Sequence, residues 1–225
     1  MNAIQSALLS KIAGLRHGFG TRHEPIPHAV ADLWLERRPK WRQVHGAQVT
    51  EAREPHQELG DCDGIWSSAH QIPVAVQTAD CVPLLFARDD GSRFAAVHAG
   101  WRGTYQEIAA AASNAMGCEK ELDRWRVAIG PAIRGCCYEV SPELVAQFRE
   151  KFGHLGADKF LTGPRHLDIQ EINRLQLARL GFLHVEVIAL CTRCTRDPDD
   201  STRLAFFSHR HKPGEGRQWA AICRR

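Results

Sequence analysis

Three short segments of the sequence carry side chains that could do chemistry at the junctions between apolar runs and turns. They are Gln43-Val-His45-Gly-Ala-Gln-Val49, Thr78-Ala-Asp80-Cys81-Val-Pro83 and Val97-His98-Ala-Gly-Trp-Arg-Gly103. Two imidazoles and a thiolate, from His45, Cys81 and His98, would make a zinc site with a fourth tetrahedral position left for water or substrate. That is the arrangement of catalytic zinc, although a histidine or cysteine taken singly is more often structural.

The cysteines offer a competing metal site. The motif Cys191-Thr-Arg-Cys194 is half of a zinc ribbon, but a second pair at matching spacing is absent. Cys136 and Cys137 are adjacent, and we expect that they cannot readily both point at one ion. A structural or incidental role is therefore the favoured prediction for Cys191 and Cys194.

Charged residues provide candidates for binding and catalysis. Arg22, Arg102 and Arg210 could bind an anionic substrate, because guanidinium groups hold phosphate at two points. Each could equally be a surface arginine in an ordinary salt bridge. Asp63 could orient a ligand histidine or bind ribose hydroxyls, or it could be a turn residue, since Asp-Gly is a common turn pair. We take Asp63, with Cys81 and His98, as the candidate catalytic group.

Short apolar runs bounded by turn residues predict the strands that must position these side chains. The runs are 72–76, 83–87, 94–98, 127–129 and 185–190. The second and third flank a polar segment that contains Asp-Gly, which predicts a hairpin.

Helical patterns alternate with these strands. They predict a helix over 104–116 ended by Gly117, one from Pro142 with Ser141 as its N-cap, and one from about Asp168 to Leu180 ended by Gly181. Strand pairs also occur without helices between them. We therefore expect an α+β fold, with mixed sheets covered by helices, in a single domain over residues 1–225.

Composition limits the function classes. The 225 residues carry a net charge of +3, which does not predict binding to nucleic acid. No run approaches the roughly 20 apolar residues of a membrane span, and the N-terminus lacks the features of a signal peptide. We expect a cytoplasmic protein without a membrane or an obligate protein partner.

Taken together, these segments resemble the multicopper polyphenol oxidoreductases, or laccase-domain proteins, now regarded as zinc-dependent purine nucleoside enzymes. The resemblance follows the family order from about residue 18 to about residue 222. It rests on the Gln43, Thr78 and His98 segments above, on Asp63-Gly-Ile, Ile129-Gly-Pro131, Cys137-Tyr-Glu-Val140 and Cys191-Thr192, and on Phe206-Phe-Ser208 with Arg210.

The resemblance implies a layered α+β sandwich with His45, Cys81 and His98 as metal ligands. The ion would be zinc, with copper as the alternative. It further implies phosphorolysis of adenosine, inosine, guanosine and methylthioadenosine, together with adenosine deamination, so that purine nucleosides and phosphate are the expected ligands. Arg22 matches an N-terminal family arginine expected to contact phosphate or ribose.

The sequence departs from the family pattern in two places. His23-Glu-Pro25 follows Arg22 where a Gly-Gly pair is usual, and Ser208-His-Arg-His211 replaces Ser-Tyr-Arg-Arg. Both changes fall at expected rim positions, so they concern substrate preference rather than the metal site.

Other functions remain as alternatives. Copper-dependent phenol oxidation would need several His-x-His pairs, and only His209-x-His211 is seen. A peptidoglycan-precursor editing hydrolase, also linked to the family, would use Cys81 and His98 as a nucleophilic pair. A partner-binding role would leave an open metal site without a purpose.

Overall fold

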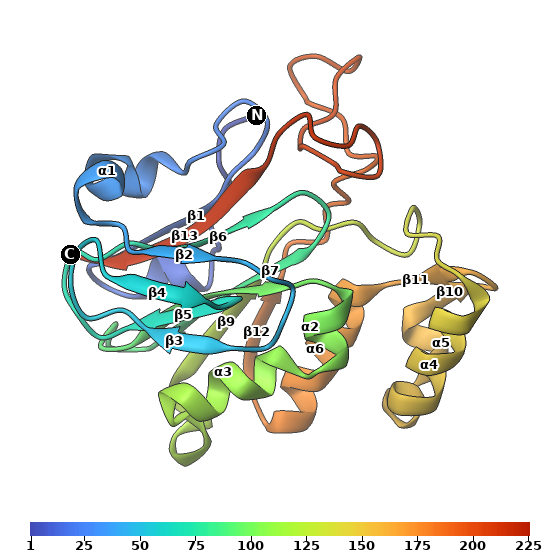
Figure 1. Cartoon of the computed structure of the whole chain (residues 1–225), viewed down its shortest axis with the longest axis horizontal. Helices are drawn as coiled ribbons and strands as arrows, with labels where there is room; N and C mark the ends of the chain where they lie inside the picture. The colour runs from blue at the N-terminus through green and yellow to red at the C-terminus, as the bar shows by residue number, and fades with distance from the viewer.

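Two β-sheets packed face to face, with helices over the outer face of the larger sheet, make up the body of the protein (Figure 1). The computed structural model describes residues 1–225. The larger sheet has the order β12 (His184–Val187), β9 (Trp125–Ile129), β7 (Val82–Arg88), β8 (Phe94–Ala99), β5 (Gly64–Ser67) and β3 (Val49–Glu51). The smaller has the order β1 (Leu15–Phe19), β13 (Gln218–Arg224) and β6 (Val74–Thr78).

The large sheet is mixed. Strand β12 pairs parallel with β9, and β3 pairs parallel with β5, whereas the other neighbours are antiparallel. Two small ribbons, β2 (Lys40–Arg42) with β4 (Glu58–Asp61) and β10 (Leu161–Gly163) with β11 (His166–Leu167), lie outside it. The expectation of an α+β fold with mixed sheets is confirmed.

Alternate side chains of the central strands supply both layers of the core. Leu84 and Phe86 of β7 face the helices, whereas Leu85 and Ala87 face the smaller sheet. This follows from the two-residue period of a strand, and burial on both faces explains why β7 is apolar throughout. Because the middle of β7 is buried on both faces, the reactive side chains Cys81 and His98 lie where the strands end.

Six α-helices and several short 3-10 helices complete the chain. They are α1 (Trp34–Arg37), α2 (Trp101–Tyr105), α3 (Ile108–Met116), α4 (Pro142–Phe152), α5 (Ala157–Phe160) and α6 (Ile169–Leu180). Helices α2, α3 and α6 cover the large sheet, and α4 and α5 stand to one side (Figure 1). No helix has the length and apolar character of a membrane span.

Two predicted helix ends, the N-cap Ser141 and the stop at Gly181, are present, and Asp168 at the expected start of the third helix is its N-cap. The Ser141 hydroxyl accepts the N–H of Leu144 at 3.3 Å, and the Asp168 carboxylate accepts the N–H of Glu171 at 3.0 Å. Gly181 ends α6 with φ of 96°. These ends are confirmed because capping depends on residues only a few positions apart.

The prediction of one helix over 104–116 was wrong. The chain forms α2 and α3, separated at Glu107, whose φ of 58° is left-handed. This break lets α3 lay Ile108 and Ala112 on the sheet while α2 continues from the turn after β8. An alanine-rich pattern favours helix on both sides of such a break and so does not reveal it.

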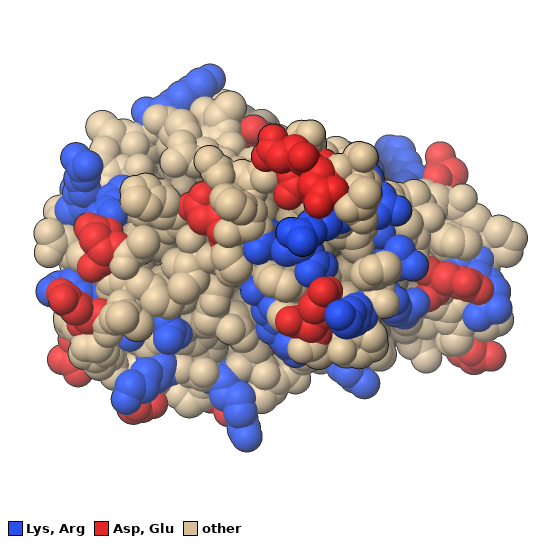
Figure 2. Space-filling view, turned by 90° about the horizontal axis from the view of Figure 1, so that it is seen from above, with Lys and Arg blue, Asp and Glu red and all other residues tan.

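All five predicted strands are present, with shifted bounds. The hairpin β7–β8 is confirmed, with Ala87 opposite Phe94 and Pro83 opposite His98. The apolar run 185–190 is a strand only as far as Val187. On the face in Figure 2, basic side chains lie interspersed with acidic ones, as the small net charge of +3 leads one to expect.

His17 in β1 makes stability depend on pH. Its ring is 2% exposed, and its Nε2 accepts the N–H of Ser6 at 2.9 Å, which requires a neutral ring. Burial lowers the pKa of His17 below its usual value, against the opposing charge of Glu186. A lowered folded-state pKa gives stability that is present above the unfolded pKa of about 6.5 and is lost as pH falls below it.

We therefore expect the free energy of unfolding to fall between about pH 7 and about pH 5, by at most about 1.4 kcal/mol per pH unit from this ring. His17→Gln, which keeps an acceptor for Ser6, should flatten that part of the profile. Urea unfolding of both proteins across this range measures the difference. Parallel profiles would show that His17 does not carry the effect.

Candidate active site

Antiparallel pairing of β7 with β8 brings Cys81 and His98 together. Val82 lies opposite Ala99, so the residue before β7 and the penultimate residue of β8 share one end of the hairpin. Gly100 lies directly beside them: a Cβ there would be 3.3 Å from the Cys81 sulfur and 3.3 Å from the His45 ring. Glycine suits this position because even a Cβ would press on the side chains of the candidate ligands and require them to shift by a few tenths of an ångström.

Asp63 joins the third ligand to this hairpin. It precedes β5, which pairs with β8, and its carbonyl accepts the N–H of His98 at 2.7 Å. Its fully buried carboxylate accepts the N–H groups of Val44, His45 and Gly46 at 3.1, 2.9 and 2.8 Å, and bonds the His98 ring at Nδ1 at 2.8 Å. One carboxylate thus shapes the loop that carries His45 and orients His98.

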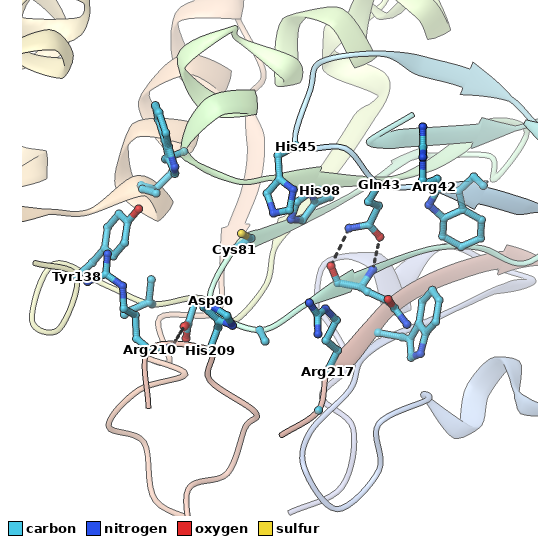
Figure 3. A pocket seen from close by; sticks show the side chains of 18 of the residues that line it. Arg42, Gln43, His45, Asp80, Cys81, His98, Tyr138, His209, Arg210 and Arg217 are labelled. Atoms are coloured by element: carbon cyan, nitrogen blue, oxygen red, sulfur yellow. Dashed lines mark hydrogen bonds between the residues drawn. The ribbon is translucent and has the colours of Figure 1, made fainter. Parts of the chain in front are cut away.

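Gln43 ties the same loop to the smaller sheet. Its side chain accepts the N–H of Gln77 at 2.7 Å and donates to the Gln77 carbonyl at 3.0 Å (Figure 3). The loop between β2 and β3 is therefore attached to both sheets, which holds His45 in place despite its exposure.

The three candidate ligands converge. The ligand atoms of His45, Cys81 and His98 all lie within 4.8 Å of one another, and the two rings meet edge to face with centroids 4.9 Å apart. Zinc binds nitrogen at about 2.0–2.1 Å and thiolate sulfur at about 2.3 Å, so an ion fits between them. Asp63 occupies Nδ1 of His98, which leaves Nε2 for the metal, as carboxylate partners of ligand histidines commonly do.

Electrostatics favour the ligand form of Cys81. Burial alone would raise the pKa of its thiol, but His98 and His45 outweigh burial and lower that pKa to about 6. Burial would lower the pKa of His98, yet Cys81 and Asp63 raise it to about 9. Burial would also raise the pKa of Asp63, but His98 and the loop N–H groups hold it below its usual value. Metal binding would displace the His98 proton.

A cavity of about 830 Å³ opens onto these ligands. Aromatic side chains form part of its wall, namely Trp41, Trp101, Tyr138 and Trp219. Four arginines also line it, namely Arg38, Arg42, Arg210 and Arg217. Figure 3 shows His45, Cys81 and His98 gathered together, with Tyr138 and Arg210 to one side of them.

The three arginines proposed from the sequence lie in different places. Arg210 lines the cavity, where it stacks on Tyr138 at 4.9 Å. Arg102 lies outside the lining, with its guanidinium 4.5 Å from the Trp101 ring. Arg22 lines a separate cavity of about 380 Å³ and pairs with Glu215 at 2.8 Å. The structure brings Arg210 to the candidate ligands but neither Arg22 nor Arg102.

Two arginines that sequence reasoning missed line the main cavity without a carboxylate or hydrogen-bond partner. They are Arg38, whose guanidinium lies among Trp34, Trp41 and Trp219, and Arg217, which is exposed. No local signal marks either residue. Tyr138 was also missed, although it belongs to the Cys137-Tyr-Glu-Val140 segment.

The comparisons with known proteins identify relatives of most of the chain. Residues 28–225 match the model of the family described as multi-copper polyphenol oxidoreductase laccase. A purine nucleoside phosphorylase of Synechocystis is 33% identical over 212 residues, covering 80% of this chain and 77% of that protein. An adenosine deaminase of an unknown prokaryotic organism is 30% identical over 203 residues, covering 82% and 74%.

A solved structure of similar fold covers nearly the whole chain. The crystal structure of YlmD from Geobacillus stearothermophilus superimposes with a TM-score of 0.77 at 28% identity, covering 99% of this chain and 98% of that one. With its mixed sheets, and with relatives named for purine nucleoside phosphorolysis and adenosine deamination, this chain belongs to the multi-copper polyphenol oxidoreductase laccase family.

Proposed function

We propose that this protein is a zinc-dependent purine nucleoside phosphorylase that acts on adenosine, inosine, guanosine and methylthioadenosine and also deaminates adenosine. The observation that carries the proposal is a three-ligand donor set beside a cavity lined by aromatic rings and arginines. The names of the relatives support an enzyme of this general kind.

The donor set suits zinc better than copper. Two histidines and a cysteine can also make a blue-copper site, but such a site adds a long axial methionine or an equivalent ligand. The chain has 2 methionines, Met1 and Met116, and neither lines the cavity, while Gln43 beside His45 bonds Gln77 through both its amide oxygen and its amide nitrogen. When bound, zinc supplies Lewis acidity to a coordinated substrate atom. The protein's part is to hold His45 and His98 in place through Asp63.

The cavity wall supplies complementary groups for both substrates. Trp101, Tyr138 and Trp219 offer flat apolar faces against which a purine can stack. Arg217 and Arg38 have no carboxylate partner, so their charges are available to phosphate. In phosphorolysis a phosphate oxygen bonds to the anomeric carbon as the glycosidic bond breaks and its electron pair leaves with the purine. Holding the phosphate in line is then the arginines' contribution.

The test is an assay for phosphate-dependent release of purine base from adenosine by zinc-loaded protein. We expect chelation to abolish release and added zinc to restore it. Release that persists after complete removal of metal, or that does not depend on phosphate, would contradict the proposal.

A cysteine hydrolase, acting as an editing enzyme on peptidoglycan precursors, is the second candidate. It is favoured by the order of Asp63, His98 and Cys81, in which a carboxylate orients an imidazole beside a sulfur. The two candidate functions predict different activities after metal removal. Metal-free protein would retain a cysteine hydrolase activity and lose it on alkylation of Cys81, whereas the phosphorylase would already be inactive.

Arg217 gives a sharper test of the phosphate site. We expect Arg217→Ala to raise the KM for phosphate about tenfold to a hundredfold, because a charge-assisted contact is worth about 1.5–3 kcal/mol. Zinc content should not change. Steady-state kinetics at varied phosphate concentration measures the effect.

Two further variants make that measurement specific. Arg53→Ala removes an exposed arginine that pairs with Glu51 and lines neither cavity, so it controls for net charge. Arg22→Ala tests the sequence-based prediction for that residue. A larger rise in KM for Arg22→Ala than for Arg217→Ala would move the phosphate site to the smaller cavity.

A further inference from the structure

Four cysteines form a second group of sulfurs outside the active-site cavity. Cys136, Cys137, Cys191 and Cys194 place their sulfur atoms within 4.8 Å of one another, and none of the four lines the cavity. The sequence has no second Cys-x-x-Cys pair, as expected, but the expectation that Cys136 and Cys137 cannot both face one ion was wrong. The fold brings two turns side by side, and this places together four cysteines whose spacing along the chain does not indicate a common site.

The two turns follow neighbouring parallel strands, β9 and β12. In the first, the N–H groups of Cys137 and Tyr138 both donate to the Arg134 carbonyl at 2.8 Å, which folds the adjacent cysteines into a tight bend. In the second, the N–H of Thr195 donates to the Cys191 carbonyl at 2.9 Å. A parallel bridge between Ala132 and Cys191 holds the turns together.

The sulfur spacing matches a tetrahedral metal site. The sulfurs of Cys136 and Cys194 are 3.8 Å apart. Tetrahedral zinc with bonds of about 2.3 Å to sulfur places its ligands about 3.8 Å from one another. All the cysteines are free thiols.

The donor set indicates both the ion and its role. Four soft thiolates without a histidine or a carboxylate suit zinc or iron rather than hard cations such as calcium and magnesium, and four cysteines are a common ligand set of structural zinc. Four protein ligands also close the tetrahedron, in contrast to the open position left by His45, Cys81 and His98. A closed site is structural rather than catalytic.

Both turns are tied to the residue before Cys81. Ile133 donates its N–H to the Asp80 carbonyl at 2.8 Å, and the Thr192 hydroxyl donates to the Asp80 carboxylate at 2.7 Å. Ile133 and Tyr138, which bracket the first pair of cysteines, line the cavity. An ion joining the turns would therefore stiffen one wall of the active site.

We propose that Cys136, Cys137, Cys191 and Cys194 bind a second, structural zinc ion that fixes the cavity wall formed by Ile133 and Tyr138.

Metal content is the direct test, on full-length protein purified with reductant and without chelator. We expect two zinc ions per chain in the unmodified protein, one in Cys81→Ser, and one in the double variant Cys136→Ser/Cys194→Ser. Both residues of the double variant are exposed, so serine there leaves the core intact. Cys118→Ala, which alters a cysteine outside both groups, should retain both ions.

A second measurement identifies the ligands directly. Cobalt(II) bound to Cys81→Ser protein should show the sulfur-to-metal charge transfer and intense visible bands of a tetrahedral four-thiolate site, and the double variant should lack them. Loss of this zinc should also lower Tm by roughly 5–10 °C, because it releases a cross-link between two loops.

Three results would overturn the proposal. One is a double variant with the zinc content of the unmodified protein. Another is a Cys81→Ser protein that binds neither zinc nor cobalt although its thiols are reduced. The third is a thiol count in denaturant, after purification with reductant, that shows a disulfide within the group. None of these depends on nucleoside turnover, so the second site and the proposed activity succeed or fail separately.

Discussion

Replacing His45 with alanine is expected to remove one zinc ion per chain and to slow phosphorolysis about a thousandfold, which corresponds to about 4 kcal/mol of lost transition-state stabilisation. His45 is exposed and contributes its ring to the candidate metal site rather than to the core. The fold should therefore survive. Zinc content, circular dichroism and phosphate-dependent base release measure the three effects.

His56→Ala is the matched control. His56 is also an exposed histidine with a left-handed backbone, φ 59° against 60° for His45, and it lies outside the cavity. Any backbone cost of alanine at positive φ is thus common to both variants, whereas the loss of zinc and activity should occur only in His45→Ala. Unchanged activity in His45→Ala would contradict the assignment of this residue as a ligand.

Replacing Asp63 with asparagine is expected to weaken zinc binding about tenfold to a hundredfold and to destabilise the fold by about 1–3 kcal/mol. Each carboxylate oxygen of Asp63 accepts two bonds: one from the N–H of His45 and from the His98 ring, the other from the N–H groups of Val44 and Gly46. An amide replaces one oxygen with a donor, so one pair of N–H groups must face an NH₂ group whichever way the side chain turns.

Asp61→Asn separates this effect from a general loss of charge. Asp61 lies two residues away, but its carboxylate is exposed and pairs with Arg42 at 2.6 Å. Its removal should change zinc affinity and the free energy of unfolding by less than about 1 kcal/mol. Zinc titration against a competing chelator and urea unfolding test both variants. Equal behaviour of the two would show that Asp63 does not support the metal ligands.

Much of the fold follows from local pattern. The apolar runs on each side of the Asp-Gly turn predict the hairpin β7–β8, and antiparallel pairing then forces Cys81 and His98 to one end of it. The caps at Ser141, Asp168 and Gly181 likewise concern residues a few positions apart. Such features depend on dihedral preferences and hydrogen bonds within one short segment, which the sequence expresses directly.

Strand β13 shows where local pattern fails. It lies between β1 and β6 and supplies buried residues to the core, yet neither β1 nor β13 was predicted. Its sequence alternates only briefly between apolar and polar residues and ends in Arg224, so local pattern does not reveal it. Its burial comes from pairing with β1 and β6, which lie far earlier in the chain.

By itself the sequence determined the family motifs, the Ser141 and Gly181 helix ends, the central hairpin and, through the family resemblance, His45, Cys81 and His98 as candidate ligands. Only the tertiary structure decided that Asp63 supports two candidate ligands at once and that Arg217 and Arg38 rather than Arg22 reach the cavity. It also decided that four cysteines from two turns lie together. The physical reason is the same for each. Side chains far apart in the chain meet only through strand register and the packing of layers, and these depend on burial summed over the whole fold.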